Sequence, residues 1–380
     1  MNIRQIFLII VLLLAMACND NKTTSIKEET AIEKKIQIVA INGSPRKDGN
    51  TATLCKRFLE GAASASKDVE ITLFNLYDLD FKGCTSCFAC KLADSDCYGR
   101  CAMEDDLTPV LEKIATADGV AIGSPIYFGE ITGELRSFLE RLLFPYVTYE
   151  ASRRTLAPKR FPTVCFYTMN VTEEGAKKNG YFEYFDKLEK LIERVFSKPE
   201  RICAYNTYQF TDYQKYKADA FDEKDKRKHK ETQFPIDCQK AFDAGKKMAK
   251  SLIIKSMLNK HSLILASMDG KIITYDDNGI KPLFNHLKNS NFQKFDVYDK
   301  ITGKASALIL IYGGAKQLYT NVLSKEAIPV LEKYGVNYHA DTIVDYIQNI
   351  KKDDKCPMEK AVANIDEPQK GFEILQQKFN

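Results

Sequence analysis

The chain has 380 residues, of which 44% are hydrophobic and 28% are charged. These fractions are ordinary for globular proteins, and the length is sufficient for two domains. The net charge is only +4, and no basic stripe interleaved with aromatic residues is present, which argues against nucleic acid as a partner.

The first 35 residues have the pattern of an export signal followed by a tether. Arg4 precedes an apolar run over residues 6–17, which is short for a bilayer span and ends at Cys18. The sequence Leu-Ala-Met-Ala-Cys resembles a bacterial lipobox, and this resemblance implies lipidation of Cys18. We therefore interpret residues 1–18 as a lipoprotein signal peptide and residues 19–35 as a flexible tether, which predicts a membrane-anchored lipoprotein facing the periplasm or the cell exterior. A retained single membrane anchor is the alternative.

A short apolar run at residues 36–41 is typical of a strand buried on both faces of a parallel sheet. It breaks at residues 43–49, and a helix begins at Asn50. A strand, a polar loop and a helix start form a phosphate site, because free N–H groups and the positive end of the helix dipole meet there. The candidate phosphate ligands lie on this loop or in the first helical turn: Ser44, Arg46, Asn50, Thr51 and Ala52. On this stretch alone, an ordinary strand-to-helix turn is the alternative.

Strands and helices alternate over the first domain, for which we predict the limits 36–256. The predicted strands are 36–41, 70–76, 120–124, 163–167 and 201–205, and the predicted helices are 51–65, 107–115, 133–143, 181–196 and 238–257. This alternation predicts a parallel, doubly wound α/β sheet that binds its ligand at the carboxyl ends of the strands. Residues 209–235 are interpreted as an insertion or long loop with a solvated, charged face.

A second ligand-facing loop, residues 124–133, follows the third strand and is expected beside the phosphate loop. Its aromatic side chains can pack against a flat ring, while backbone groups near the glycine can bind the ring edge. The candidate residues in this loop are Pro125, Ile126, Tyr127, Phe128 and Gly129. A third loop, residues 168–175, is placed beside them by topology alone.

The sequence from Gly43-Ser44-Pro45-Arg46 to about Leu143 resembles the flavodoxin-like NAD(P)H-dependent FMN reductases and the related iron–sulfur flavoproteins. The resemblance implies a flavodoxin-like fold in which the first loop surrounds the phosphate of FMN and the second contacts its isoalloxazine ring. NAD(P)H is the expected electron donor, and a protein or a small molecule is the expected acceptor. Related folds often dimerise across the flavin site, so a homodimer is one expected assembly. No residue pattern supports the assignment of a catalytic acid or base.

Five cysteines follow the second predicted strand: Cys84, Cys87, Cys90, Cys97 and Cys101. The first three are separated by two residues each, and such compact spacing is what a 4Fe–4S cluster requires. The resemblance to iron–sulfur flavoproteins implies such a cluster, with Cys84, Cys87, Cys90 and Cys97 as ligands. The six residues before Cys97 and the additional Cys101 depart from the family pattern. Zinc, disulfides (favoured by export) and free thiols at the flavin edge remain alternatives.

The second domain, residues 258–380, begins with two predicted strands joined by a turn at residues 268–270. Three stretches further along, residues 279–283, 299–305 and 356–361, resemble a domain-of-unknown-function family with a cytidine-deaminase-like α/β fold, and the resemblance covers nearly all of this domain. A zinc deaminase needs His-x-Glu and Pro-Cys-x-x-Cys, but residues 303–305 read Gly-Lys-Ala and only Cys356 is present at the second position. We therefore predict no zinc-activated water. Lys304 and Cys356 are candidates for lining a ligand pocket, and a structural role is an equal alternative.

Two functions are compatible with these features. The leading hypothesis is an FMN-dependent NAD(P)H oxidoreductase or electron-transfer flavoprotein, with a cysteine-bound iron–sulfur cluster as an addition to it. The alternative is a non-catalytic membrane-tethered lipoprotein with a ligand-binding, deaminase-like second domain.

Overall fold

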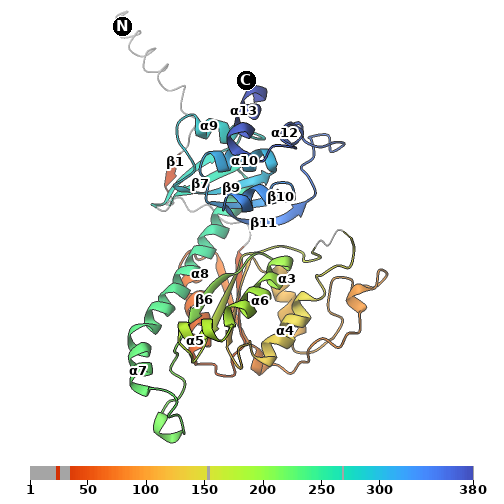
Figure 1. The fold of residues 1–380 in the computed structure, drawn as a ribbon. Helices are drawn as coiled ribbons and strands as arrows, with labels where there is room; N and C mark the ends of the chain where they lie inside the picture. The colour runs from red at the N-terminus through yellow and green to blue at the C-terminus, as the bar shows by residue number, and fades with distance from the viewer. Residues whose placement is uncertain (1–22, 26–34, 152–154, 268, 380) are drawn as a thin grey trace, which may run out of the picture. The chain divides into compact units, whose positions relative to one another are not determined.

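A computed structural model describes residues 23–25, 35–151, 155–267 and 269–379 (Figure 1). The described residues divide into two compact units, one before and one after the boundary between Ile253 and Ile254, and residues 23–25 belong to the second. The predicted signal peptide, the lipidation site Cys18 and most of the predicted tether lie outside the described residues. Of the tether, Thr23–Ser25 forms a short strand, β1. In the part of the chain that is described, no helix is sufficiently long and apolar to traverse a bilayer.

The first unit contains a sheet of five parallel strands in the order β3-β2-β4-β5-β6. Their limits are β2 (Ile36–Asn42), β3 (Val69–Asn75), β4 (Gly119–Pro125), β5 (Thr163–Thr168) and β6 (Glu200–Ala204). In sequence order this is 2-1-3-4-5, the flavodoxin-like arrangement, and the predicted fold class is confirmed. The winding reverses between β2 and β4, so the loops that follow these two strands border the ligand crevice.

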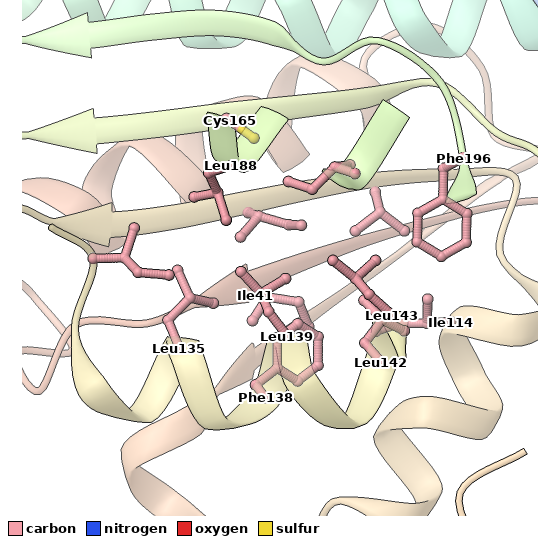
Figure 2. Packing of buried hydrophobic residues seen from close by; sticks show 14 of the residues in the cluster. Ile41, Ile114, Leu135, Phe138, Leu139, Leu142, Leu143, Cys165, Leu188 and Phe196 are labelled. Atoms are coloured by element: carbon pink, nitrogen blue, oxygen red, sulfur yellow. The ribbon is translucent and has the colours of Figure 1, made fainter. Parts of the chain in front are cut away.

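Helices cover both faces of this sheet. One face packs against α3 (Thr108–Thr116), α4 (Gly133–Leu143) and α6 (Tyr181–Val195). Figure 2 shows Leu135, Phe138, Leu139 and Leu142 of α4 among the side chains of this core. The other face packs against α2 (Asn50–Ala63) and α8 (Phe234–Ser256). The central strands β2, β4 and β5 are therefore buried on both faces, which explains their nearly continuous apolar sequences.

The region 209–235 differs from the predicted solvated loop. It contains a short 3-10 helix, Tyr213–Lys215, and the helix α7 (Glu223–Thr232). A further short helix, α5 (Glu173–Lys178), follows β5. Lys226 of α7 is buried and donates to the carbonyl oxygen of Asn170 at 2.8 Å. Lys226 is therefore not part of a solvated face, because it connects α7 to the loop after β5 through a hydrogen bond.

Helices α2 and α8 cross at two glycines. A Cβ atom on Gly61 would lie 1.9 Å from the carbonyl oxygen of Phe242, and one on Gly245 would lie 1.9 Å from that of Phe58. Both contacts are with backbone atoms, which cannot move aside as a flexible side chain can. The crossing therefore depends on the absence of a side chain at both positions.

The second unit is a smaller α/β domain, as predicted. Its sheet has the order β1-β8-β7-β9-β10-β11, in which β9, β10 and β11 are parallel and β7 is antiparallel to both of its neighbours. The strands are β7 (Leu263–Ser267), β8 (Lys271–Tyr275), β9 (Phe295–Thr302), β10 (Gln317–Ser324) and β11 (Asn337–Val344). Its helices are α9 (Lys281–Leu287), α10 (Lys304–Tyr312), α11 (Ile328–Lys333), α12 (Pro357–Ala361) and α13 (Pro368–Phe379). Strands β9 and β11 and helix α13 were not predicted.

Substitution of Gly61 by Ala tests the helix crossing. We expect Gly61→Ala to lower the free energy of unfolding by at least about 2 kcal/mol, because the methyl group forces the two backbones apart. Chemical denaturation followed by circular dichroism measures this loss. Gly133→Ala is the matched control, since its Cβ would meet no atom within 4 Å; an equal loss in both variants would contradict the crossing argument.

Candidate functional site

The two predicted ligand loops meet at the carboxyl edge of the parallel sheet. The Gly43 N–H donates to the Gly123 carbonyl oxygen at 2.8 Å, and the Thr132 hydroxyl donates to the Gly43 carbonyl oxygen at 2.7 Å. The same Thr132 hydroxyl accepts from the Leu135 N–H and so caps the N-terminus of α4. The predicted juxtaposition of the loops is therefore observed, and Thr132, which the sequence did not single out, joins them.

The first loop ends at an uncapped helix start. The residue before α2, Gly49, has no side chain with which to accept a hydrogen bond, and the first turn of α2 contains no acidic residue. Ser44 is buried, and its hydroxyl accepts from the Arg46 N–H at 3.1 Å, while the Asn42 side chain accepts from the Ser44 N–H at 3.1 Å. The loop is thus held rigidly while the N–H groups of α2 stay available to an anion.

The remaining residues predicted for this loop contact other parts of the chain. The Arg46 guanidinium donates to the Gln209 carbonyl oxygen at 2.6 Å, and the Asn50 amide donates to that of Tyr208 at 3.0 Å. The hydroxyl of Thr51 lies 2.7 Å from that of Thr168, and Ala52 is buried. Sequence reasoning missed the segment after β6, although its dense aromatic residues, Tyr208, Phe210, Tyr213 and Tyr216, were a signal of packing.

The second loop forms a tight two-residue turn. The N–H groups and carbonyl oxygens of Tyr127 and Glu130 bind each other at 2.8 and 3.0 Å, and the two residues between them, Phe128 and Gly129, have φ values of 54° and 85°. Two positive φ values are those of a type I′ turn. Phe128 is fully exposed, and Tyr127 is partly exposed. The adjoining residues, Pro125 and Ile126, continue β4, where the Ile126 N–H donates to Thr168.

The third loop carries an unsatisfied polar atom. The Oδ1 atom of Asn170 is buried and has no hydrogen-bond partner among the described residues. Nearby, the Lys226 ammonium donates to the Asn206 side chain at 3.0 Å, and burial lowers the pKa of Lys226. A buried acceptor without a partner is uncommon in folded proteins. Its position after β5 places it at the same edge as the other two loops.

Four of the cysteines line one cavity: Cys84, Cys87, Cys90 and Cys101. Ser86 and Phe88, which alternate with the first three, have φ values of 56° and 57°. Left-handed residues alternating with others curve the backbone into a concave nest, a shape found around many iron–sulfur sites. Phe88, Phe144 and Pro145 contribute apolar walls. The sequence predicted three of these thiols and named Cys97 in place of Cys101.

A buried arginine fixes the cysteine loop to α4. The side chain of Arg141 is fully buried and forms an ion pair with Asp105 at 2.7 Å. It also donates to the carbonyl oxygens of Lys82 and Met103 at 3.0 and 3.1 Å, and its Nε donates to the Cys101 sulfur at 2.9 Å. Burial acts to raise the pKa of Asp105, but the hydrogen bonds and charge of Arg141 lower it overall.

A lysine fixes the opposite side of the loop. The Lys91 ammonium donates to the carbonyl oxygens of Phe144, Pro145 and Val147 at 2.5, 3.0 and 2.6 Å. These carbonyls follow α4, where a cation is favoured by the helix dipole. Burial is the main factor that raises the pKa of the adjacent Cys90 thiol, while the charge of Lys91 acts in the opposite direction.

A second pocket lies on the other side of Cys101 and Arg141. It has a volume of about 420 Å³, and its walls include Leu111, Tyr146 and Leu156 in addition to Cys101 and Arg141. This volume lies within the range of about 300 to 1,000 Å³ that is common for small-molecule sites. The two cavities therefore share one thiol and one guanidinium as a common wall.

All ten cysteines of the described part of the chain are free thiols. Within these residues, no three His, Cys, Asp or Glu side chains converge closely enough to hold a single metal ion. A 4Fe–4S cube makes a different demand, because its thiolates surround a four-iron core rather than one ion. The cysteine cavity has the side chains for this demand, because four thiols line one space together with the apolar side chains of Phe88, Phe144 and Pro145.

Comparison with known proteins agrees with this geometry. The family described as NADPH-dependent FMN reductase matches residues 36–161, and the domain of unknown function DUF1893 matches residues 253–379. An iron–sulfur flavoprotein of Clostridioides difficile is 32% identical over 183 residues, which cover 42% of this chain and 76% of the relative. The chain belongs to the iron–sulfur flavoprotein family.

A second member of this family, from Methanocaldococcus jannaschii, is 34% identical over 106 residues, covering 28% of this chain and 51% of that protein. The chain thus spans about half the length of this relative. Among solved structures, an NAD(P)H:quinone oxidoreductase from Methanothermobacter marburgensis has a TM-score of 0.42 and 15% identity, covering 56% of this chain and 96% of that one.

The deaminase-like residues of the second domain contact one another. The Glu359 carboxylate accepts from the backbone N–H groups of Lys304 and Ala305 at 3.0 and 2.9 Å, at the start of α10. The Lys304 ammonium donates to Ala363 at 2.8 Å and pairs with Asp366 at 2.8 Å. A carboxylate of the chain itself therefore occupies the start of α10, and Cys356 stands immediately before α12, which carries this carboxylate.

A buried acid in the same domain gives a pH-dependent prediction. Burial raises the pKa of Asp299 to about 7, although Thr302 donates to its carboxylate at 2.8 Å. Between the unfolded pKa of about 3.9 and this value, the folded state binds a proton that the unfolded state lacks, so stability falls as pH rises. We expect Asp299→Asn to flatten this decline in calorimetric scans of the full chain from pH 4 to 8. If the pH dependence of stability is unchanged in Asp299→Asn, the buried carboxyl of Asp299 is not its cause.

Proposed function

We propose that the first domain binds FMN and acts as an NAD(P)H-dependent oxidoreductase or electron-transfer flavoprotein. The observation that carries the proposal is the direct bonding of the two loops through Gly43, Gly123 and Thr132 at the edge where β2 and β4 diverge. This edge is the ligand crevice of doubly wound sheets. Membership of a flavoprotein family supports FMN as the occupant.

Different residues of the chain would bind the phosphate and the ring of FMN. The uncapped N–H groups of α2 and the Arg46 guanidinium, which Gln209 orients, would hold the phosphate. Tyr127 and Phe128, which are exposed on the second loop, would flank the ring. When bound, FMN supplies the hydride and single-electron chemistry. No side chain is assigned as a general acid or base.

The cysteine cavity would hold a 4Fe–4S cluster in the same domain. Support comes from the four lining thiols, the left-handed residues between them and the family to which the chain belongs. The pocket of about 420 Å³ beside Cys101 offers room for a small-molecule acceptor near the cluster. The proposal keeps the lipid anchor at Cys18, which would hold the enzyme at a membrane surface.

Loss of the Arg46 cation tests the phosphate site. We expect Arg46→Ala to weaken FMN binding by about 10-fold or more, since a hydrogen bond to a charged group contributes roughly 1.5–3 kcal/mol. Titration of the apoprotein with FMN, followed by flavin fluorescence, measures the change. Lys56→Ala is the matched control, because Lys56 also belongs to this region but pairs with Asp48 at 2.7 Å; similar weakening by both substitutions would indicate only a general charge effect.

Anaerobic mixing with NADH or NADPH tests the activity. We expect the protein to be yellow as purified and the flavin absorbance to fall after nicotinamide is added, with loss of the nicotinamide absorbance in step. A colourless protein that cannot be reconstituted with FMN would support the non-catalytic lipoprotein instead. A flavoprotein that only a protein donor can reduce would retain the electron-transfer function and exclude nicotinamide.

A further inference from the structure

We propose that Cys101, rather than Cys97, is the fourth cluster ligand and that Arg141 is a positioning residue that raises the reduction potential of the cluster. This inference rests on the proposed function, since it concerns the same cysteine cavity. Spacing along the sequence favours Cys97, which lies nearer to the Cys84-x-x-Cys87-x-x-Cys90 run. The folded chain favours Cys101.

The backbone between the two cysteines folds back on itself. The Arg100 N–H donates to the Cys97 carbonyl oxygen at 2.8 Å, and the Gly99 N–H donates to that of Cys90 at 3.1 Å. Gly99 has a φ of 76°, which a residue with a side chain adopts only with strain. This turn returns the chain to Cys90 and brings Cys101 to the cavity.

The surroundings of the two thiols also favour Cys101 over Cys97 as the ligand. Cys101 lines the cavity with the three other cysteines, whereas Cys97 is absent from its walls. The Cys101 sulfur accepts a hydrogen bond from the buried Arg141 at 2.9 Å. The Cys97 sulfur accepts a longer hydrogen bond, of 3.8 Å, from the exposed guanidinium of Arg100. Cys97 therefore contributes its carbonyl oxygen to the turn, and Cys101 provides the fourth thiol of the cavity.

Arg141 has a further consequence for a cluster at this site. Its other N–H donors are held by Asp105, Lys82 and Met103, so the side chain cannot turn away from the sulfur. Hydrogen bonds to the sulfur atoms and nearby positive charge stabilise the more negative, reduced form of an iron–sulfur cluster. The Nε donor of Arg141 should therefore raise the reduction potential.

Matched cysteine variants test the ligand assignment. The full chain, Cys101→Ala and Cys97→Ala are purified without oxygen, and iron, acid-labile sulfide and FMN are measured in each, together with spectra before and after dithionite. We expect Cys97→Ala to match the wild type and Cys101→Ala to lose most of its iron and sulfide or its 4Fe–4S spectrum, with FMN retained in both. Loss in Cys97→Ala with retention in Cys101→Ala overturns the assignment, and so does retention in both. A wild type without iron and sulfide instead refutes the cluster itself.

Redox titration tests the role of Arg141. Arg141→Lys keeps a cation for Asp105 but removes the Nε donor, and we expect a lower cluster midpoint potential with wild-type iron content. Arg100→Gln is the control, because its guanidinium faces Cys97, and it should leave the potential unchanged. An unchanged potential in Arg141→Lys, or an equal shift in both variants, overturns the positioning role. If Arg141→Lys does not fold, Arg141→Gln combined with Asp105→Asn removes the same donor without leaving a buried charge unpaired, and the same lower potential is expected.

Discussion

Helix α4 is the constraint on which the site depends. Thr132 caps its first turn and binds the phosphate loop, and Arg141 in its last turn binds the cysteine loop. At 1.5 Å per residue, the two positions lie about 14 Å apart along the helix axis. The helix is anchored by Phe138 and Leu139 in the core, so the two loops cannot move independently. A flavin and a cluster bound there would therefore keep a constant separation.

Two buried cations have comparable roles in this domain. Arg141 pairs with Asp105 and satisfies backbone carbonyls of the cysteine loop, and Lys226 satisfies the backbone of the third loop. Burial of a charge is costly unless hydrogen bonds and an opposite charge compensate for it. Arg141 has both kinds of partner, whereas Lys226 is held by two neutral acceptors, the Asn170 carbonyl and the Asn206 side chain. Both side chains donate to backbone carbonyls of loops at the candidate site, which is where a ligand site needs rigidity.

The strands of the parallel sheet and the loop that follows the first of them could be predicted from the sequence, because they are local patterns of apolar residues followed by turn residues. The flavodoxin-like arrangement of the sheet was implied by the family resemblance. The cysteines that line the cavity could be predicted only in part. The choice between Cys97 and Cys101 depends on the turn at Gly99, whose hydrogen bond to Cys90 spans nine residues. Arg141 belonged to a predicted helix and Thr132 to the predicted second loop, but neither was singled out, since their partners lie far away in the sequence. Ser86 and Phe88 in the cysteine loop and Phe128 in the second ligand loop have positive φ values. Their residue types do not indicate this backbone conformation.

The central claim is that one rigid domain connects a flavin to an iron–sulfur cluster. Anaerobic stopped-flow mixing of the loaded protein with a flavin reductant tests it most directly, by following the flavin and cluster absorbances separately. The account predicts that the flavin is reduced first and that the cluster follows at a rate independent of protein concentration. A cluster that stays oxidised, or is reduced at a rate proportional to protein concentration, would contradict it.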